Sequence, residues 1–245
     1  MPPESVVLIP ARYGSTRFPG KALHRIGGKP LVQHVWERCR QADAVDEVIV
    51  ATDDQRIADV ATAFGARVEM TSVAHPSGTD RIAEVAARLS MAQVIINVQG
   101  DEPLIDPALI TLLVQRLKED RSISMITAAS AIDAAADIAN PNIVKVVLNA
   151  RFDALYFSRS AIPFVRDGRP AVPFFRHHGI YGYRRSFLLE FVRWEPGLLE
   201  KTEQLEQLRA LENGASIRVV LTQSASIGID TPEDAARCES LLSPV

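Results

Sequence analysis

Short apolar runs alternate with stretches of helical periodicity through the first half of the chain. Runs rich in Val and Ile indicate buried strands, and apolar residues that recur every three or four positions predict helices between them. The predicted strands cover residues 6–10, 47–52, 67–70 and 93–98, and the predicted helices cover 30–40, 55–64, 80–89 and 107–118. This alternation predicts a parallel sheet with helices on both faces.

The second half of the chain has a less regular pattern. Its predicted strands cover 124–129, 143–148, 155–157, 174–183 and 217–221, and its predicted helices cover 184–192, 202–211 and 231–241, with a turn or short helix at 196–201. Three prolines around Asp167 and Gly168 predict a loop or an extended arm over residues 162–173. We expect a single α/β domain over residues 1–245.

Composition narrows the class of protein and of ligand. Hydrophobic residues make up 47% of the 245 positions, which is enough for a full core, and the formal net charge is −3. No global positive field exists, so we expect no nucleic-acid polymer as a partner. Cys39 and Cys238 form neither a metal-binding spacing nor a disulfide framework, which favours a reducing cytoplasm. The sequence shows no signal peptide and no membrane span, so no membrane partner is expected.

The first predicted strand leads into a loop that is rich in small and cationic residues. The apolar run ends at Pro10, and the following residues include Arg12, Gly14, Ser15, Thr16, Arg17, Gly20 and Lys21. Glycines allow close approach to the backbone, hydroxyls and N–H groups donate hydrogen bonds, and cations neutralise phosphate charge. The spacing of a Walker loop is absent. The loop therefore predicts a phosphate site that is not a Walker loop. The alternative is an ordinary solvated loop between a strand and a helix.

Carboxylates follow two other turning points of the chain. Gln99, Asp101 and Glu102 follow the strand at 93–98, at the carboxyl end where open α/β sheets bind ligands. Asp230 precedes the last predicted helix, where it is suited to cap the helix, to coordinate a cation, or both. Thr231 is already a competent cap. Two separated carboxylates and a cationic loop fit Mg²⁺, which takes one or two carboxylates together with phosphate oxygens and water.

Six motifs resemble one enzyme family, and they occur in order over nearly the full length. They are PARYGSTRFPGK, HPSGTDR, NVQGDEP, RHHGIYGYRRSF, EKTEQLEQLRALENG and GIDTPED. Together they resemble the 3-deoxy-manno-octulosonate cytidylyltransferase (CMP-Kdo synthetase) family. The resemblance implies a Rossmann-like mixed sheet with helices on both faces, of the nucleotide-diphospho-sugar transferase type. It also implies a strand-rich arm at about 150–195 that carries the sugar site and the dimer contact.

The resemblance implies roles for particular residues on the nucleotide side. The nucleotide-binding set is Arg12, Ser15, Lys21, Ser77 and Arg81, of which Arg12 and Lys21 also join the catalytic set with Asp101 and Asp230. These two aspartates match the family's Mg²⁺ ligands. Arg17 lies in the same loop without an assigned role. On the residues alone, the alternative interpretation of Arg81 is a surface cation on a helix.

The implied sugar-binding set is Gln99, His177, Glu206 and Gln207. His177 is preferred to the adjacent His178, although a lone histidine on a strand is more often structural. Glu203, Glu206 and Gln207 share one face of the helix predicted at 202–211, and Glu203 is expected to be solvated.

Two further aspartates receive a structural interpretation. Asp53 and Asp54 are expected to cap the helix predicted at 55–64 and to bind no metal.

The implied reaction joins CTP and 3-deoxy-D-manno-octulosonate (Kdo) to give CMP-Kdo and pyrophosphate, for lipopolysaccharide biosynthesis. The anomeric hydroxyl attacks the α-phosphate in line with assistance from Mg²⁺, and the enzyme is expected to be a cytoplasmic homodimer. Alternatives are a cytidylyltransferase for 8-amino-Kdo or sialic acid, and a glycosyltransferase of similar fold. A glycosyltransferase usually carries an Asp-x-Asp motif, which Asp101 and Glu102 match poorly. The non-enzymatic alternative is a nucleotide-binding regulatory module.

Overall fold

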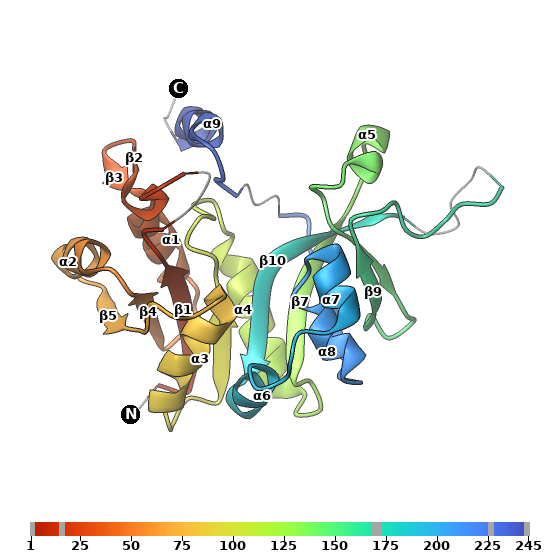
Figure 1. Ribbon diagram of the computed structural model, residues 1–245, viewed down its shortest axis with the longest axis horizontal. Coiled ribbons are helices and arrows are strands. Elements are labelled where there is room, and N and C mark those ends of the chain that lie inside the picture. Colours follow the sequence, from red (N-terminus) through yellow and green to blue (C-terminus); the bar gives the residue numbers. More distant parts are fainter. Residues whose placement is uncertain (1–2, 15–17, 168–172, 225–227, 243–245) are drawn as a thin grey trace.

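A mixed sheet of nine strands forms the centre of the protein (Figure 1). The computed structural model describes residues 3–14, 18–167, 173–224 and 228–242. The strands are β1 (Ser5–Ala11), β2 (Arg25–Ile26), β3 (Lys29–Pro30), β4 (Glu47–Thr52), β5 (Arg67–Met70), β6 (Val94–Asn97), β7 (Met125–Ala131), β8 (Lys145–Leu148), β9 (Ala154–Ser158), β10 (Phe175–Arg184) and β11 (Ile217–Leu221). The sheet order is β11-β7-β10-β6-β1-β4-β5, β8 and β9 attach beside β10, and β2 and β3 form a separate hairpin.

Strand β1 lies at the centre of the parallel part of the sheet. It pairs in parallel with β4 on one side and with β6 on the other. Its apolar residues are fully buried and alternate between two cores, with Val7 and Ile9 on one face and Val6 and Leu8 on the other. A strand buried on both faces needs a continuous apolar run, which is why the sequence predicted it well.

Helices cover both faces of the sheet (Figure 1). They are α1 (Leu31–Cys39), α2 (Gln55–Ala63), α3 (Gly78–Arg88), α4 (Pro107–Glu119), α5 (Ala135–Ala139), α6 (Arg185–Phe191), α7 (Leu198–Glu203), α8 (Leu208–Glu212) and α9 (Pro232–Leu242), with a 3-10 turn η1 at Lys21–Leu23. The core on one face includes residues of α1, α2 and α4, and the core on the other includes residues of α3, α6 and α8. The predicted mixed α/β fold with helices on both faces is therefore confirmed.

Strand β10 joins the two halves of the molecule because it runs antiparallel between β6 and β7. At Gly182 an added Cβ would lie 2.7 Å from Ile126 and 2.9 Å from Ile96, so only glycine fits between these side chains. The pairing with β7 is irregular between His178 and Tyr181. The rings of His177 and Tyr181 are consequently 5.4 Å apart, whereas residues four apart on a regular strand are separated by about 13 Å.

The prediction of one helix over residues 202–211 is wrong. The structure has α7 and α8 instead, and the chain turns between them at Gln204, whose φ of 56° lies in the left-handed region. This turn ends α7 and buries Leu205 in the core. The free energy gained by burying this leucine outweighs the preference of the sequence for one continuous helix. As a result, Glu206 and Gln207 lie in a connection and do not share a helix face with Glu203.

No helix in the described ranges is long and apolar enough to cross a membrane.

Candidate active site

A cavity of about 310 Å³ opens at the carboxyl ends of β1 and β6. The chain passes from β1 to β4 on one side and later returns to β6 on the other, so this is the point at which ligands bind in open α/β sheets. The predicted site residues that line the cavity are Arg12, Lys21, Ser77, Arg81, Gln99, Asp101 and Asp230. Ser15 and Arg17 lie outside the described residues.

The turn after β6 is held close to the end of β1. A Cβ added to Gly100 would lie 2.8 Å from the carbonyl oxygen of Pro10, a distance that no side chain tolerates. Glycine at position 100 therefore allows the turn to pass against the end of β1. The same packing presents the neighbouring Gln99 and Asp101 to the cavity.

Three segments of the chain meet at the ammonium group of Lys21. The Nζ atom donates to Asp101 Oδ2, to Asp230 Oδ1 at 3.3 Å and to the carbonyl oxygen of Ile229 at 3.2 Å. The backbone N–H of Ile229 donates to the carbonyl oxygen of Asp101 at 2.9 Å, which ties the two aspartate-bearing turns together. Lys21 thus forms ion pairs with two carboxylates in a partly buried site.

The two carboxylates fit a hard divalent cation. Asp101 and Asp230 both reach the same ammonium group, so their oxygens converge on one small region. Among the described residues there is no group of three or more His, Cys, Asp or Glu side chains that could hold a metal. The two carboxylates leave coordination positions of such a cation open to phosphate oxygens and water. Mg²⁺ suits this arrangement because it combines one or two carboxylates with phosphate oxygens and water.

The cap of α9 is supplied by Thr231 and leaves Asp230 to the cavity. Thr231 Oγ1 accepts from the backbone N–H of Asp234 at 3.2 Å, and Asp234 Oδ2 accepts from the backbone N–H groups of Asp230 and Thr231. This reciprocal arrangement satisfies the first turn of the helix. The carboxylate of Asp230 is accordingly available to Lys21.

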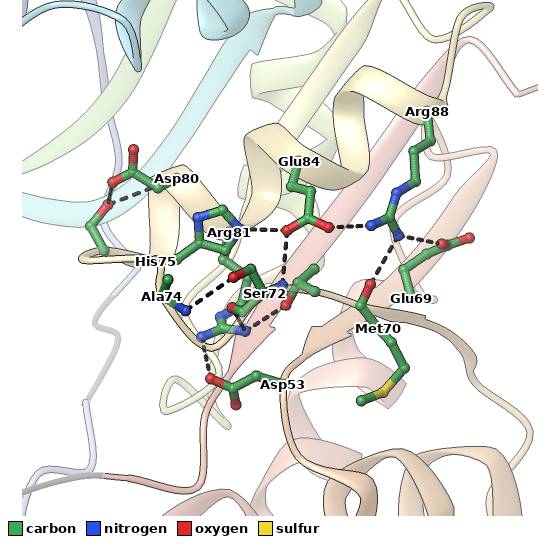
Figure 2. A network of polar contacts seen from close by, with 12 residues as sticks. Asp53, Glu69, Met70, Ser72, Ala74, His75, Asp80, Arg81, Glu84 and Arg88 are labelled. Carbon is green, nitrogen blue, oxygen red and sulfur yellow. Dashed lines mark hydrogen bonds and ion pairs between the residues drawn. The ribbon is translucent and has the colours of Figure 1, made fainter.

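The guanidinium of Arg81 is buried in the wall of the cavity. Figure 2 shows it pointing toward Asp53. Arg81 is 3% exposed, and its Nη2 atom donates to Asp53 Oδ2 at 2.6 Å while Nη1 donates to Thr71 Oγ1. Asp54, not Asp53, caps α2. The prediction that both aspartates are caps is therefore half wrong, because Asp53 compensates a buried charge. The interpretation of Arg81 as a surface cation is excluded by its burial.

The N-terminus of α3 forms another part of the wall. Ser77 caps this helix by accepting from the backbone N–H of Asp80 at 3.1 Å, and both Ser77 and Gly78 line the cavity. Unpaired N–H groups at a helix start favour anions. His75 also lines the cavity, and its Nε2 atom lies 2.5 Å from Glu84 Oε2 (Figure 2).

His177 lies on β10 in an aromatic environment, outside the lining of this cavity. Its ring packs edge-on against Phe157 at 5.0 Å and beside Tyr181. Desolvation, assisted by the nearby His178, lowers the pKa of His177 from 6.5 to about 3. The ring is therefore neutral at physiological pH. Thr127 Oγ1 donates to the carbonyl oxygen of Ile180 at 2.7 Å, so it accepts from His177 Nε2, 3.0 Å away, and the Nδ1 atom is left as an acceptor.

His178 has a different set of partners. Its Nε2 atom lies 2.9 Å from Ser130 Oγ, and it lines a separate cavity with Arg176 and Asp137. Adjacent residues of a strand face opposite sides of the sheet, so one ring alone belongs beside Tyr181.

Glu206 contacts the start of α3 directly. Its Oε1 atom lies 2.8 Å from Ser77 Oγ, and its Oε2 atom accepts from Thr79 Oγ1 at 2.6 Å. Desolvation raises the pKa of Glu206, although these hydrogen bonds and the charge of Arg209 act in the opposite direction. Through these two hydroxyls, the segment between α7 and α8 contacts the start of α3, where Ser77 lines the cavity.

Gln207 and Glu203 differ sharply in their surroundings. Gln207 is 5% exposed, and its Nε2 atom has no hydrogen-bond partner among the described residues, so it is a buried amide with donor capacity to spare. Glu203 accepts from Ser158 Oγ and from the backbone N–H of Arg159. The expectation that Glu203 is solvated is therefore wrong, since it ties α7 to the end of β9.

Sequence and structure comparisons agree on one family. Residues 6–217 match the family described as Cytidylyltransferase. The chain is 56% identical over 239 residues to the 3-deoxy-manno-octulosonate cytidylyltransferase of Geobacter metallireducens, with 93% of each chain covered. It is 54% identical to the enzyme of the same description from Geobacter sulfurreducens, with 93% and 94% covered. The chain belongs to the 3-deoxy-manno-octulosonate cytidylyltransferase family. It is a nucleotidyltransferase.

One solved structure supports the family assignment, and a more distant one supports the fold. A CMP:2-keto-3-deoxy-manno-octonic acid synthetase complexed with CTP superposes with a TM-score of 0.93 at 44% identity, covering 98% of each chain. The 4-diphosphocytidyl-2C-methyl-D-erythritol synthase of Anaerococcus prevotii superposes with a TM-score of 0.64 at 12% identity, and this likeness concerns the fold alone.

Sequence reasoning about the cytidylyltransferase missed several residues that the structure brings to the site. It assigned no role to Thr79, Asp80 or Tyr181, which surround Glu206 and His177. The available signal was composition. Two hydroxyls and a carboxylate fall within the single motif HPSGTDR, and two tyrosines follow the histidines on β10.

Proposed function

We propose that this cytidylyltransferase converts CTP and Kdo to CMP-Kdo and pyrophosphate in the cavity at the carboxyl ends of β1 and β6. One observation carries the assignment of the cavity. Lys21, Asp101 and Asp230 converge there from three distant segments, beside Arg12 and the N-terminus of α3. A relative of 44% identity, with nearly complete overlap, has been solved in complex with CTP.

On the nucleotide side, cations and helix N–H groups receive the triphosphate. Arg12 and Lys21 neutralise phosphate charge, and Lys21 follows that charge onto the departing pyrophosphate. Arg81 and Ser77 bind the nucleotide from the cavity wall, beside these two cations. Asp101 and Asp230 would hold Mg²⁺, which would supply Lewis-acid polarisation of the α-phosphate. The protein itself contributes orientation and charge compensation, which dominate transfers of this type.

On the sugar side, four residues bind the sugar acid and orient its anomeric hydroxyl for in-line attack. Gln99 faces the sugar from the cavity lining, and Glu206 and Gln207 supply acceptor and donor groups for a polyol. His177 serves as a neutral hydrogen-bonding group, since its pKa of about 3 leaves it uncharged. Its free Nδ1 atom accepts a hydrogen bond from a sugar hydroxyl.

We further propose that one domain over residues 1–245 forms a homodimer through its strand-rich arm, and that the enzyme acts in the cytoplasm for lipopolysaccharide biosynthesis. Phe164 and Leu155, both within residues 150–195, are 88% and 61% exposed. Large apolar side chains with this exposure favour a protein–protein contact.

The direct test measures pyrophosphate release from CTP with Kdo, 8-amino-Kdo and sialic acid, each with and without Mg²⁺. We expect Mg²⁺-dependent release that is fastest with Kdo. Faster release with another sugar acid identifies a different substrate. Binding of CTP without release, for every acceptor, supports the regulatory module, and consumption of a preformed nucleotide sugar supports the glycosyltransferase.

A further inference from the structure

Two carboxylates approach one hydroxyl at the junction of α3 and the α7–α8 connection. Ser77 Oγ lies 2.6 Å from Asp80 Oδ2 and 2.8 Å from Glu206 Oε1. The same oxygen accepts from the backbone N–H of Asp80 at 3.1 Å. The second oxygen of Glu206 is held by Thr79. This cluster rests on the turn at Gln204, which brings Glu206 toward α3.

A proton count shows that these contacts need one more hydrogen than the ionised side chains supply. A serine hydroxyl donates one hydrogen and accepts up to two. Ser77 Oγ therefore donates to one carboxylate only, and one of its acceptor sites is taken by the N–H of Asp80. Its remaining acceptor site faces the other carboxylate. That contact is attractive only if the carboxylate carries a proton.

The other groups around Glu206 do not remove this requirement. On α8, Arg209 Nη2 lies 3.8 Å from Glu206 Oε1, and its guanidinium is engaged at 2.8 Å and 2.6 Å by the carboxylate of Glu200. On β10, Tyr181 and Tyr183 face Glu206, and both are neutral because their pKa values are raised well above 10. On α3, Asp80 adds a negative charge.

We propose that Asp80 and Glu206 share one proton through Ser77, and that Asp80 is a positioning residue that keeps the Glu206 carboxyl neutral toward the incoming sugar acid. This inference rests on the assignment of Glu206 to the sugar. A neutral carboxyl both donates and accepts hydrogen bonds to hydroxyls. It also avoids repulsion of the substrate's own carboxylate, which an ionised Glu206 would exert. The shared proton thus adapts a carboxyl for an anionic sugar.

A consequence concerns the dependence of sugar affinity on pH. Below the pKa of Glu206, which burial raises, the carboxyl is protonated and the KM for the sugar acid is low. Above it the proton is lost and KM rises. Asp80→Asn removes the neighbouring charge, so Glu206 ionises at lower pH. We call the pH at which KM begins to rise the break. If Asp80→Asn lowers the break by about one pH unit, the KM of the variant is about tenfold higher than that of wild type at pH values above both breaks.

The kinetic test measures kcat and both KM values in wild type, Asp80→Asn and Asp59→Asn, at pH values from within the ordinary glutamate range to well above it. Asp59 is an exposed aspartate of α2 whose side chain contacts Gln55, so its substitution is the matched control. We expect a downward shift of the break in the sugar KM for Asp80→Asn alone, with the KM for CTP following wild type. Glu206→Gln cannot lose a proton, so its sugar KM should not vary with pH.

A second measurement does not depend on turnover. Nuclear magnetic resonance of carbon-13-labelled glutamate side chains, with Glu206 assigned through Glu206→Gln, follows the titration of this carboxyl in the full chain. Titration above the ordinary glutamate range, lowered in Asp80→Asn, supports the shared proton. Ordinary titration in wild type, or an unchanged value in Asp80→Asn, overturns it. A shifted titration without turnover of any sugar acid leaves the shared proton standing and refutes the assignment to the sugar.

Discussion

The buried ion pair between Asp53 and Arg81 gives a quantitative test of how the cavity wall is built. Asp53→Ala removes the carboxylate that lies 2.6 Å from Arg81 Nη2, while the guanidinium stays in a site that is 3% exposed. Removing one member of a buried pair costs about 3–5 kcal/mol, because the other charge loses its partner. Thr71 still accepts a hydrogen bond from Arg81, so we expect about 3 kcal/mol, the lower end of that range.

This loss is large enough to measure as a change in melting temperature. A chain of this length unfolds with an entropy of about 0.5 kcal/mol/K, so a loss of about 3 kcal/mol lowers Tm by about 6 °C in differential scanning calorimetry. Asp54→Ala is the control, because it removes a carboxylate of the same turn that caps α2 and pairs with the exposed Arg56. Loss of a cap costs about 1 kcal/mol, which corresponds to about 2 °C.

The double variant separates stability from ligand binding. Asp53→Ala combined with Arg81→Met leaves no buried charge, so most of the lost stability should return. The KM for CTP should stay elevated, because Arg81 lines the cavity. The reasoning is refuted if Asp53→Ala lowers Tm no more than Asp54→Ala does, or if the double variant is the less stable of the two Asp53 variants.

Three further predictions concern other parts of the site. Asp101→Asn should lower kcat by about 100-fold at saturating Mg²⁺ while the KM for Kdo changes little, and near-normal turnover contradicts its role as a metal ligand. Gly182→Ala should cost about 1–3 kcal/mol in urea unfolding, because the added methyl would lie 2.7 Å from Ile126, and an unchanged midpoint contradicts this packing. The lowered pKa of His177 means that the unfolded chain binds the extra proton between pH 6.5 and about 3. Stability should fall as pH decreases through that window, less steeply in His177→Asn, and equal slopes contradict the burial of a neutral ring.

The strands were the most predictable part of the fold. The bounds of β4, β5 and β11 agree with the predicted ranges 47–52, 67–70 and 217–221. The antiparallel direction of β10 has no local signature, because apolar alternation is the same in either direction. Short elements such as α5 escaped prediction, since five residues contain too little periodicity to identify a helix.

The site was predictable to the extent that its chemistry lies at the ends of strands. Lys21, Asp101 and Asp230 were chosen from separate segments, and the structure brings them to one ammonium group. The pairing of Arg81 with Asp53 could not be read from the sequence. The two residues are 28 positions apart, and nothing local distinguishes a cap from the partner of a buried cation.

The error over the helix at 202–211 shows why the sugar side is harder to predict than the nucleotide side. Leucines at 205, 208 and 211 favour one continuous helix, and such a helix would carry Glu206 on a solvated face. The left-handed turn at Gln204 instead buries Leu205 and directs the carboxyl of Glu206 to the hydroxyls of Ser77 and Thr79. Position 204 holds neither glycine nor asparagine, the residues that favour a left-handed backbone. Tertiary packing therefore decides the conformation of this turn. The nucleotide site depends on where strands end, whereas the sugar site depends on this one turn, which local propensity does not encode.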